Sequence, residues 1–114
     1  MPRKRFILSG YRAVWLLAMF DLPIGSPQAR RDYTHFRNSL LAHGFSMLQF
    51  SVYARFFPNL ESSRAYRNQI LRAMPPSGEV RLLTITDRQF GKMEVFLRGI
   101  RTPPEKPLDQ LLLF

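Results

Sequence analysis

The stretch Ala13-Val14-Trp15-Leu16-Leu17-Ala18-Met19-Phe20 runs directly into Asp21-Leu22-Pro23 and decides the fold. An uninterrupted apolar run has no polar face to turn toward water, so a strand at 13–20 must be covered on both sides. The run is too short to span a membrane as a helix, which takes about 20 apolar residues. Pro23 ends the strand because proline cannot donate to a ladder and restricts the residue before it. Asp21 is therefore predicted at the carboxyl end of a central strand, where a carboxylate either binds a metal ion or merely caps a turn.

The composition of the chain predicts one soluble domain that handles nucleic acid. With 114 residues, 46% of them apolar, the chain is long enough for one hydrophobic core. The absence of cysteine excludes disulfides and thiolate zinc sites, and it fits a cytoplasmic location. We expect no attachment to a membrane, because no basic helix with a broad apolar face is visible.

The charge of the chain is strongly positive and is carried mainly by arginine. Lysine and arginine number 17 against 8 acidic residues, which gives a net charge of +9. Only Lys4, Lys92 and Lys106 are lysines. The planar guanidinium group matches phosphate oxygens in a bidentate manner, whereas lysine acts as a mobile point charge. This balance favours a nucleic-acid partner, although charge that serves solubility alone would look similar.

The first half of the chain predicts a strand, a helix and two further strands. Residues 1–12 form a basic lead-in. Ser26-Pro27 is a typical helix start, and Gly44 is suited to end that helix in a left-handed conformation. The segment 45–57 has strand character but exceeds the usual strand length, so we expect a tight reversal near 49–51. The helix is expected to bury a stripe with helical spacing, formed by Ala29, Tyr33, Phe36 and Leu40.

The second half adds a helix, a strand and a short terminal strand. A second helix is predicted to begin at Pro58-Asn59 and to end at 75–78, where two prolines and a glycine occur. A strand at 80–86, one helical turn at 87–93 and a short strand at 94–97 follow. This order predicts an α+β, ferredoxin-like βαββαβ domain over residues 13–97, with an additional short C-terminal strand.

The predicted sheet has two helices on one face and an open second face. Because the strands carry apolar residues on both faces, we expect a homodimer packed sheet to sheet. Residues 98–114 form a proline-rich spacer and an apolar C-terminal tail. The tail either covers its own dimer or docks into a different protein, and the spacer favours the second alternative.

Three segments together resemble the small CRISPR-associated adaptation nuclease family, the ferredoxin-like partner of the spacer integrase. The form found beside type II systems is the most similar. The resemblance covers roughly residues 13 to 97, and its most specific parts are the aspartate after the first strand and the Gln-x-Ser-Val-aromatic run. The segments are Phe20-Asp21-Leu22-Pro23, Gly44-Phe45-Ser46-Met47-Leu48-Gln49-Phe50-Ser51-Val52-Tyr53 and Val80-Arg81-Leu82-Leu83-Thr84-Ile85-Thr86.

The resemblance implies a homodimer in which the Asp21 side chains of two subunits face each other and bind one Mg²⁺ or Mn²⁺. Two facing carboxylates repel each other unless a cation or a proton lies between them. A divalent ion there would orient water and neutralise a scissile phosphate, so the implied reaction is hydrolysis of a phosphodiester in RNA or DNA. The resemblance also implies an integrase subunit as partner, with the C-terminal tail as a candidate contact.

The loop after Asp21 departs from the family pattern. Many members follow the aspartate with Ser/Asp-rich residues and an early arginine, whereas Leu22–Ser26 is longer and apolar here. The candidates for phosphate contact are instead Arg30, Arg31, Arg37 and Arg55. Each of them alternatively serves as a solvated surface residue or as part of a surface ion pair.

Three functions follow from these observations. The first is architectural: the dimer bridges integrase subunits and holds duplex DNA during spacer acquisition. The second is a Mg²⁺-dependent endonuclease with Asp21 as metal ligand and catalytic residue. The architectural function is favoured, because one acidic residue per subunit without an evident general base is sparse for fast hydrolysis. The third is an RNA-binding module without catalysis, which the shared fold keeps open although the aromatic motif of RNA-recognition domains is absent.

Overall fold

The apolar run at 13–20 forms β1 (Val14–Asp21), an inner strand of a four-stranded antiparallel sheet. A computed structural model describes residues 12–103 of the chain. The strand order is β2-β3-β1-β4, with β2 (Ser46–Gln49), β3 (Val52–Phe57) and β4 (Glu79–Thr86). All residues of β1 up to Phe20 are buried except Met19, which is half-buried, so the predicted coverage of both faces is confirmed.

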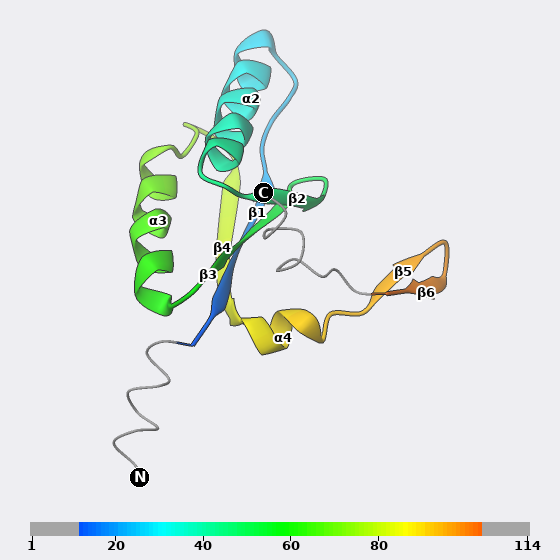
Figure 1. Cartoon of the computed structure of the whole chain (residues 1–114). Helices are drawn as coiled ribbons and strands as arrows, with labels where there is room; N and C mark the ends of the chain where they lie inside the picture. The colour runs from blue at the N-terminus through cyan, green and yellow to red at the C-terminus, as the bar shows by residue number, and fades with distance from the viewer. Residues whose placement is uncertain (1–11, 104–114) are drawn as a thin grey trace.

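Two long helices cover one face of this sheet (Figure 1). They are α2 (Pro27–Ala42), between β1 and β2, and α3 (Leu60–Arg72), between β3 and β4. The Ser26 hydroxyl accepts from the Ala29 amide at 3.1 Å, and the Asn59 side chain accepts from the Ser62 amide at 2.8 Å. These N-caps satisfy amides that have no partner within the helix. The predicted starts of both helices and the ferredoxin-like order of elements are confirmed.

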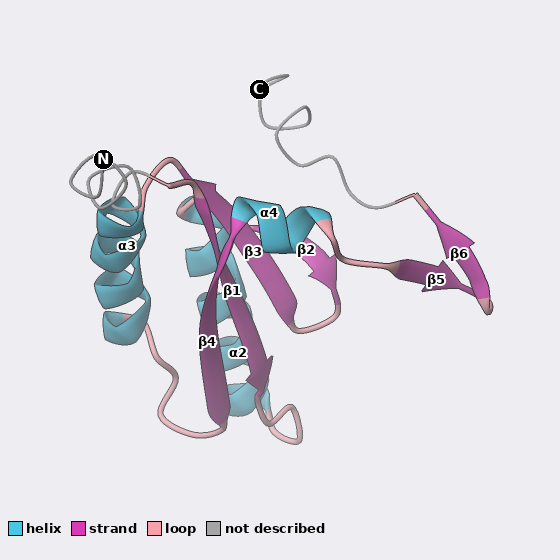
Figure 2. Ribbon diagram, turned by 90° about the horizontal axis from the view of Figure 1, so that it is seen from below, coloured by secondary structure: helices cyan, strands magenta, loops and turns pink. Residues whose placement is uncertain are grey.

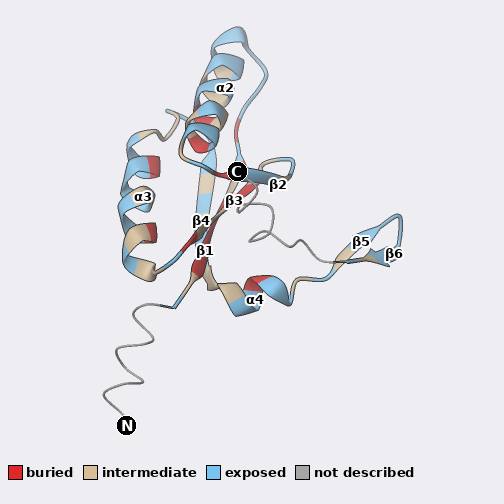
Figure 3. Cartoon of the chain, viewed as in Figure 1, coloured by how far each residue is buried: buried red, intermediate tan, exposed pale blue. Residues whose placement is uncertain are grey.

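The main core lies between the helices and the sheet. Buried residues of β1 on this face alternate along the strand, as the twofold period of a strand requires. Phe36 and Leu40 of α2 and Ile70 of α3 pack onto them. Figure 3 shows buried residues, in red, on the sides of α2 and α3 that face the sheet. The cluster comprises Val14, Leu16, Ala18, Phe20, Leu22, Phe36, Leu40, Phe45, Tyr53, Phe57 and Ile70.

The reversal expected near 49–51 is confirmed as a two-residue turn between β2 and β3. Gln49 pairs with Val52, so Phe50 and Ser51 form the turn. Ser51 has a φ of 62°, which lies in the left-handed region. This region is unfavourable for most residues other than glycine and asparagine. The chain therefore reverses without the glycine that normally marks such a turn.

A short helix partly covers the second face of the sheet. The helical turn expected at 87–93 is confirmed as α4 (Asp87–Gly91). Figure 2 shows α4 in front of the strands and α2 behind them. The Phe90 ring stacks on Trp15 with 4.0 Å between centroids, and the Trp15 indole N–H donates to Asp87 at 2.7 Å. The sequence did not predict that this turn folds back onto the sheet.

The last described elements form a separate hairpin. The expected short strand at 94–97 is confirmed as β5 (Val95–Leu97), which pairs with β6 (Ile100–Thr102). The sequence did not predict β6, which lies within the 98–114 segment. The basic lead-in up to residue 11 and the apolar tail from 104 lie outside the described residues. Within residues 12–103, no helix combines the length and the apolar composition needed to cross a membrane.

Candidate functional site

Asp21 is the last residue of β1 and is exposed, as predicted. Side chains alternate between the faces of a strand, so Asp21 shares a face with Trp15, Leu17 and Met19. This is the face opposite α2 and α3, which we call the second face. Trp15 and Leu17 are buried there in a small cluster, whereas the carboxyl end of the strand is open.

The backbone at Asp21 is held from both neighbouring strands. On one side Asp21 pairs with Glu79 of β4. On the other side the Phe20 amide donates to the Ser51 carbonyl at 3.0 Å, which ties the β2–β3 turn to the end of β1. Gly78 has a φ of 96°, and a Cβ atom there would lie 2.8 Å from the Asp21 carbonyl oxygen. The chain thus needs glycine at 78 to pass this close to Asp21.

The electrostatic surroundings of Asp21 suit a hard cation. Within residues 12–103, its carboxylate makes neither a side-chain hydrogen bond nor an ion pair, whereas Glu79 pairs with Arg81 at 2.9 Å. Residues directly opposite on antiparallel strands have Cβ atoms about 4.5–5.5 Å apart, so Glu79 and its partner Arg81 are the charged neighbours of Asp21 on β4. Carboxylate oxygens are the ligands that Mg²⁺ and Mn²⁺ prefer.

One copy of the described chain offers few metal ligands at this place. Among residues 12–103 there is no group of three or more His, Cys, Asp or Glu side chains that would hold an ion. Asp21 and Glu79 supply two carboxylates at most. A cation at Asp21 would therefore draw its remaining ligands from water, from the substrate or from a second copy.

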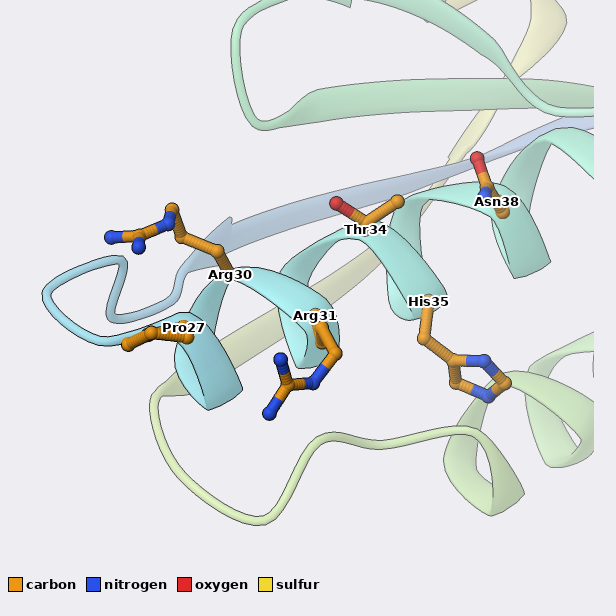
Figure 4. Close-up of a pocket in the computed structure, with 6 residues that line it drawn as sticks. All are labelled: Pro27, Arg30, Arg31, Thr34, His35 and Asn38. Carbon is orange, nitrogen blue, oxygen red and sulfur yellow. The ribbon is translucent and has the colours of Figure 1, made fainter.

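Arg30 and Arg31 are exposed at the first turns of α2. Arg30 donates to the Ile24 carbonyl at 3.1 Å, and Arg31 donates to the Gln28 side chain at 2.9 Å. Figure 4 shows their guanidinium groups diverging on either side of Pro27, at the end of the helix that carries the positive dipole. Both belong to a shallow surface depression lined by Pro27, Arg30, Arg31, Thr34, His35 and Asn38.

Arg37 and Arg55 are half-buried and make contacts within the fold. Arg37 donates through Nε to the Tyr53 hydroxyl at 2.8 Å. Arg55 donates to the His43 carbonyl at 2.8 Å and lies 4.0 Å from the centroid of the Tyr66 ring. The sequence indicated the same role, contact with phosphate, for all four arginines. In the structure, the two arginines on the first turns of α2 are exposed, whereas these two are half-buried. Contact with phosphate stays a prediction for all four.

Two further residues at this end of the sheet were not singled out from the sequence. Glu79 becomes a neighbour of Asp21 only through the pairing of β1 with β4, which sequence spacing does not reveal. Phe50 is 86% exposed in the β2–β3 turn. Phe50 is the residue between Gln49 and Ser51 in the Gln-x-Ser-Val run. The sequence pattern placed it in a strand segment and predicted no function for it.

Known proteins similar to this chain come from one family. The sequence model of "CRISPR associated protein Cas2" matches residues 14–93. A protein of Parvibaculum lavamentivorans named "CRISPR-associated endoribonuclease Cas2" is 44% identical over 101 residues, covering 89% of this chain and all of the relative. Proteins with the same name from Flavobacterium psychrophilum and Paracidovorax avenae are each 40% identical. They cover 94% and 95% of this chain, and 93% and 100% of the relatives.

Proposed function

This chain belongs to the CRISPR-associated protein Cas2 family, and from that membership we propose that it acts in CRISPR adaptation as a homodimer. In this role the dimer holds duplex DNA and bridges subunits of the spacer integrase. The observation that carries the proposal is the second face of the sheet, which is apolar but only partly covered by residues 12–103. Leu83, opposite Leu17 on this face, is 48% exposed.

A second copy packed on this face would bury Leu83 and exclude water from the strand ends. Burial of apolar surface favours such a contact, against the cost of ordering the two subunits. It would also bring two copies of Asp21 toward the dimer axis, because Asp21 lies on the same face. The cation predicted there would then draw ligands from both subunits, in keeping with the few carboxylates that one copy offers.

The arginines at the start of α2 support binding to a phosphate backbone. Arg30 and Arg31 are exposed, no acidic residue lies in the first turn of α2, and the helix dipole favours anions at this end. Contacts of this kind are independent of sequence, and the affinity for duplex falls steeply as salt rises.

The homodimer is tested by light scattering on the wild type and on Leu83→Glu. A buried carboxylate at the contact is unfavourable without a partner, so L83E is expected to halve the mass while the circular dichroism spectrum stays unchanged. Leu71→Glu, on the exposed side of α3, is the matched control and should remain dimeric. A wild type that runs as a monomer, or an L83E that stays dimeric, would contradict the proposed packing.

The nucleic-acid part is tested by titrating a short duplex at several salt concentrations. Replacing both Arg30 and Arg31 by alanine should weaken binding at each salt concentration and reduce the slope of log K against log salt by about 2. Adding an integrase subunit should produce a joint complex in size-exclusion chromatography. The absence of any joint complex would remove the bridging role while leaving duplex binding open.

A second candidate function is a metal-dependent endoribonuclease. It is favoured by the exposed carboxylate of Asp21, which has no side-chain partner within residues 12–103, and by the name that the relatives carry. Asp21, with Glu79 beside it, would hold Mg²⁺ or Mn²⁺, and the bound ion would orient water and neutralise charge on the scissile phosphate. Asp21→Asn should abolish metal-dependent cleavage of RNA while the dimer persists. If D21N cleaves as fast as the wild type, Asp21 has no catalytic role.

The same variant separates the architectural and enzymatic functions. If the role is architectural, D21N retains duplex binding and spacer insertion at wild-type levels. If spacer acquisition depends on hydrolysis, D21N loses spacer insertion together with metal-dependent cleavage, while the dimer persists. An RNA-binding module without catalysis would instead bind RNA as a monomer and show no dependence on metal.

A further inference from the structure

Phe50 is the most exposed large apolar side chain among the described residues, at 86%. A tight turn is normally built from glycine, asparagine, aspartate, serine or proline. Phe50 contributes little to the core in this position, because its ring is almost wholly in water. A single exposed apolar residue is common on proteins, so its surroundings decide whether it has a function.

The turn that carries Phe50 is held in place at the end of β1. The Ser51 carbonyl accepts from the Phe20 amide at 3.0 Å, directly before Asp21. The Gln49–Val52 pair closes the turn on its other side. The φ of 62° at Ser51 is a conformation that persists only where the surroundings impose it. The backbone of the turn therefore holds Phe50 beside the end of β1 that carries Asp21, with the ring exposed to solvent.

Positive charge lies at the same end of the molecule. The loop that leaves Asp21 leads into α2, and Arg30 donates to the Ile24 carbonyl in that loop. The end of β1 therefore brings together an aromatic ring, the exposed Asp21 carboxylate and exposed arginines. Aromatic side chains stack on nucleobases, while arginines and a bound cation attract phosphates.

From this juxtaposition we propose that Phe50 is a stacking platform for an unpaired base of single-stranded nucleic acid. The inference deepens the proposed function, on which it depends. It names single strands as the ligand of this end of the sheet, because the bases of a duplex are already stacked on each other and do not offer a face to the ring. Every base has such a face, so the contact carries little sequence preference.

A second copy of the chain is the competing occupant of the Phe50 ring. The homodimer proposed above packs through the second face, whose exposed apolar residue is Leu83 of β4. Phe50 instead lies in the turn between β2 and β3, outside the buried cluster of the second face. A second copy carries the same net charge of +9, whereas a nucleic acid brings phosphates that complement the exposed Arg30 and Arg31. The charge of the chain thus favours a nucleotide as the occupant.

The experiment uses the full chain and a single-stranded RNA of about 12 nucleotides, a length in the range that single-strand sites occupy, with one 2-aminopurine. Phe50→Ala is expected to lower the affinity about 5- to 150-fold, the equivalent of the 1–3 kcal/mol that stacking of one base contributes. Quenching of 2-aminopurine by the wild type should be lost as well. Affinity for a blunt duplex DNA should stay within twofold, roughly the error of such titrations.

Two further variants separate stacking from general apolar contact. Phe50→Leu keeps most of the apolar volume but has no aromatic face, so it should behave like F50A. Phe50→Trp should restore both affinity and quenching. Phe96→Ala removes an exposed ring in β5, 58% exposed and outside this site, and serves as the matched control.

The outcomes distinguish the inference from the proposed function. If the wild type binds neither single strands nor duplex, the proposed function fails and the inference fails with it. If the wild type binds single strands and F50A binds them equally well, the inference alone fails. A halved mass of F50A in light scattering, or an F50L that binds like the wild type, would assign the ring to a protein contact and also overturn it.

Discussion

The two faces of β1 differ in what covers them. On the helix side, α2 and α3 close a continuous cluster of buried residues along the whole strand. On the second face, the cluster of buried residues within 12–103 comprises Trp15, Leu17, Ala54 and Phe90, and α4 covers part of the strand. One face of the strand is therefore closed by the main core, whereas Asp21 is exposed at the end of the other face. Variants on the two faces should separate these properties.

The largest effect is expected on the helix side. Phe36→Ala removes a fully buried ring and should lower the free energy of unfolding by about 3–5 kcal/mol, because the surrounding side chains cannot close the cavity. Denaturant unfolding followed by circular dichroism measures this. Phe36→Leu is the control and should cost less. A loss below about 1 kcal/mol for F36A would contradict a tightly packed helix side.

A smaller effect is expected where the backbone approaches Asp21. Gly78→Ala places a Cβ 2.7 Å from a Leu22 methyl carbon and forces alanine into a φ of 96°. We expect a loss of about 2–3 kcal/mol in the free energy of unfolding. Gly25→Ala, which meets no atom within 4 Å, is the matched control. Equal stabilities of G78A and G25A would show that the close approach at Asp21 does not constrain the chain.

The contact between α4 and the second face should contribute less. Asp87→Ala removes the acceptor of the Trp15 indole N–H and should cost about 1–2 kcal/mol, since a buried donor is left without a partner. Asp87→Asn keeps an uncharged acceptor and should cost about half as much. Tryptophan fluorescence during unfolding measures both. If D87A matched F36A in its effect, the two faces would be equally important for stability.

The smallest effect on stability is expected at the end of the strand. Asp21→Asn should change the free energy of unfolding by less than about 0.5 kcal/mol, because the side chain is exposed and has no partner within the described residues. The same variant should lose metal-dependent cleavage, as proposed above. Thermal unfolding with and without Mg²⁺ provides the measurement, and only the wild type should be stabilised by the ion. A strongly destabilised D21N would assign the carboxylate to the fold.

Much of the secondary structure followed from local patterns. The apolar run before Pro23 predicted β1, and Ser26 and Asn59 predicted the starts of the two long helices, because a cap acts on amides only a few residues away. The strand β6 and the return of α4 onto the sheet were not predicted. The return of α4 depends on a contact between Trp15 and Asp87, which are 72 residues apart, and no local period encodes it. The strand β6 pairs with β5 across the two-residue turn Arg98-Gly99, a local signal that was not recognised in the sequence.

The candidate site was predictable in part. Asp21 was found because a strand end can be read from the sequence. Its neighbours Glu79 and Phe50 belong to β4 and to the β2–β3 turn. They could be identified only once the register of the sheet was known. The contacts of Arg37 and Arg55 could not be predicted from the sequence either. Their partners, the Tyr53 hydroxyl and the His43 carbonyl, come close only when the chain has folded.

The sequence by itself determined a basic, arginine-rich α+β chain with a buried central strand and a carboxylate at its end, since hydrophobic run length, helix caps and net charge are local or summed properties. Only the tertiary structure decided which face of that strand is closed, which arginines are exposed and what lies beside Asp21. Antiparallel pairing and the packing of α4 join residues that are far apart in the chain, and their geometry exists only after folding.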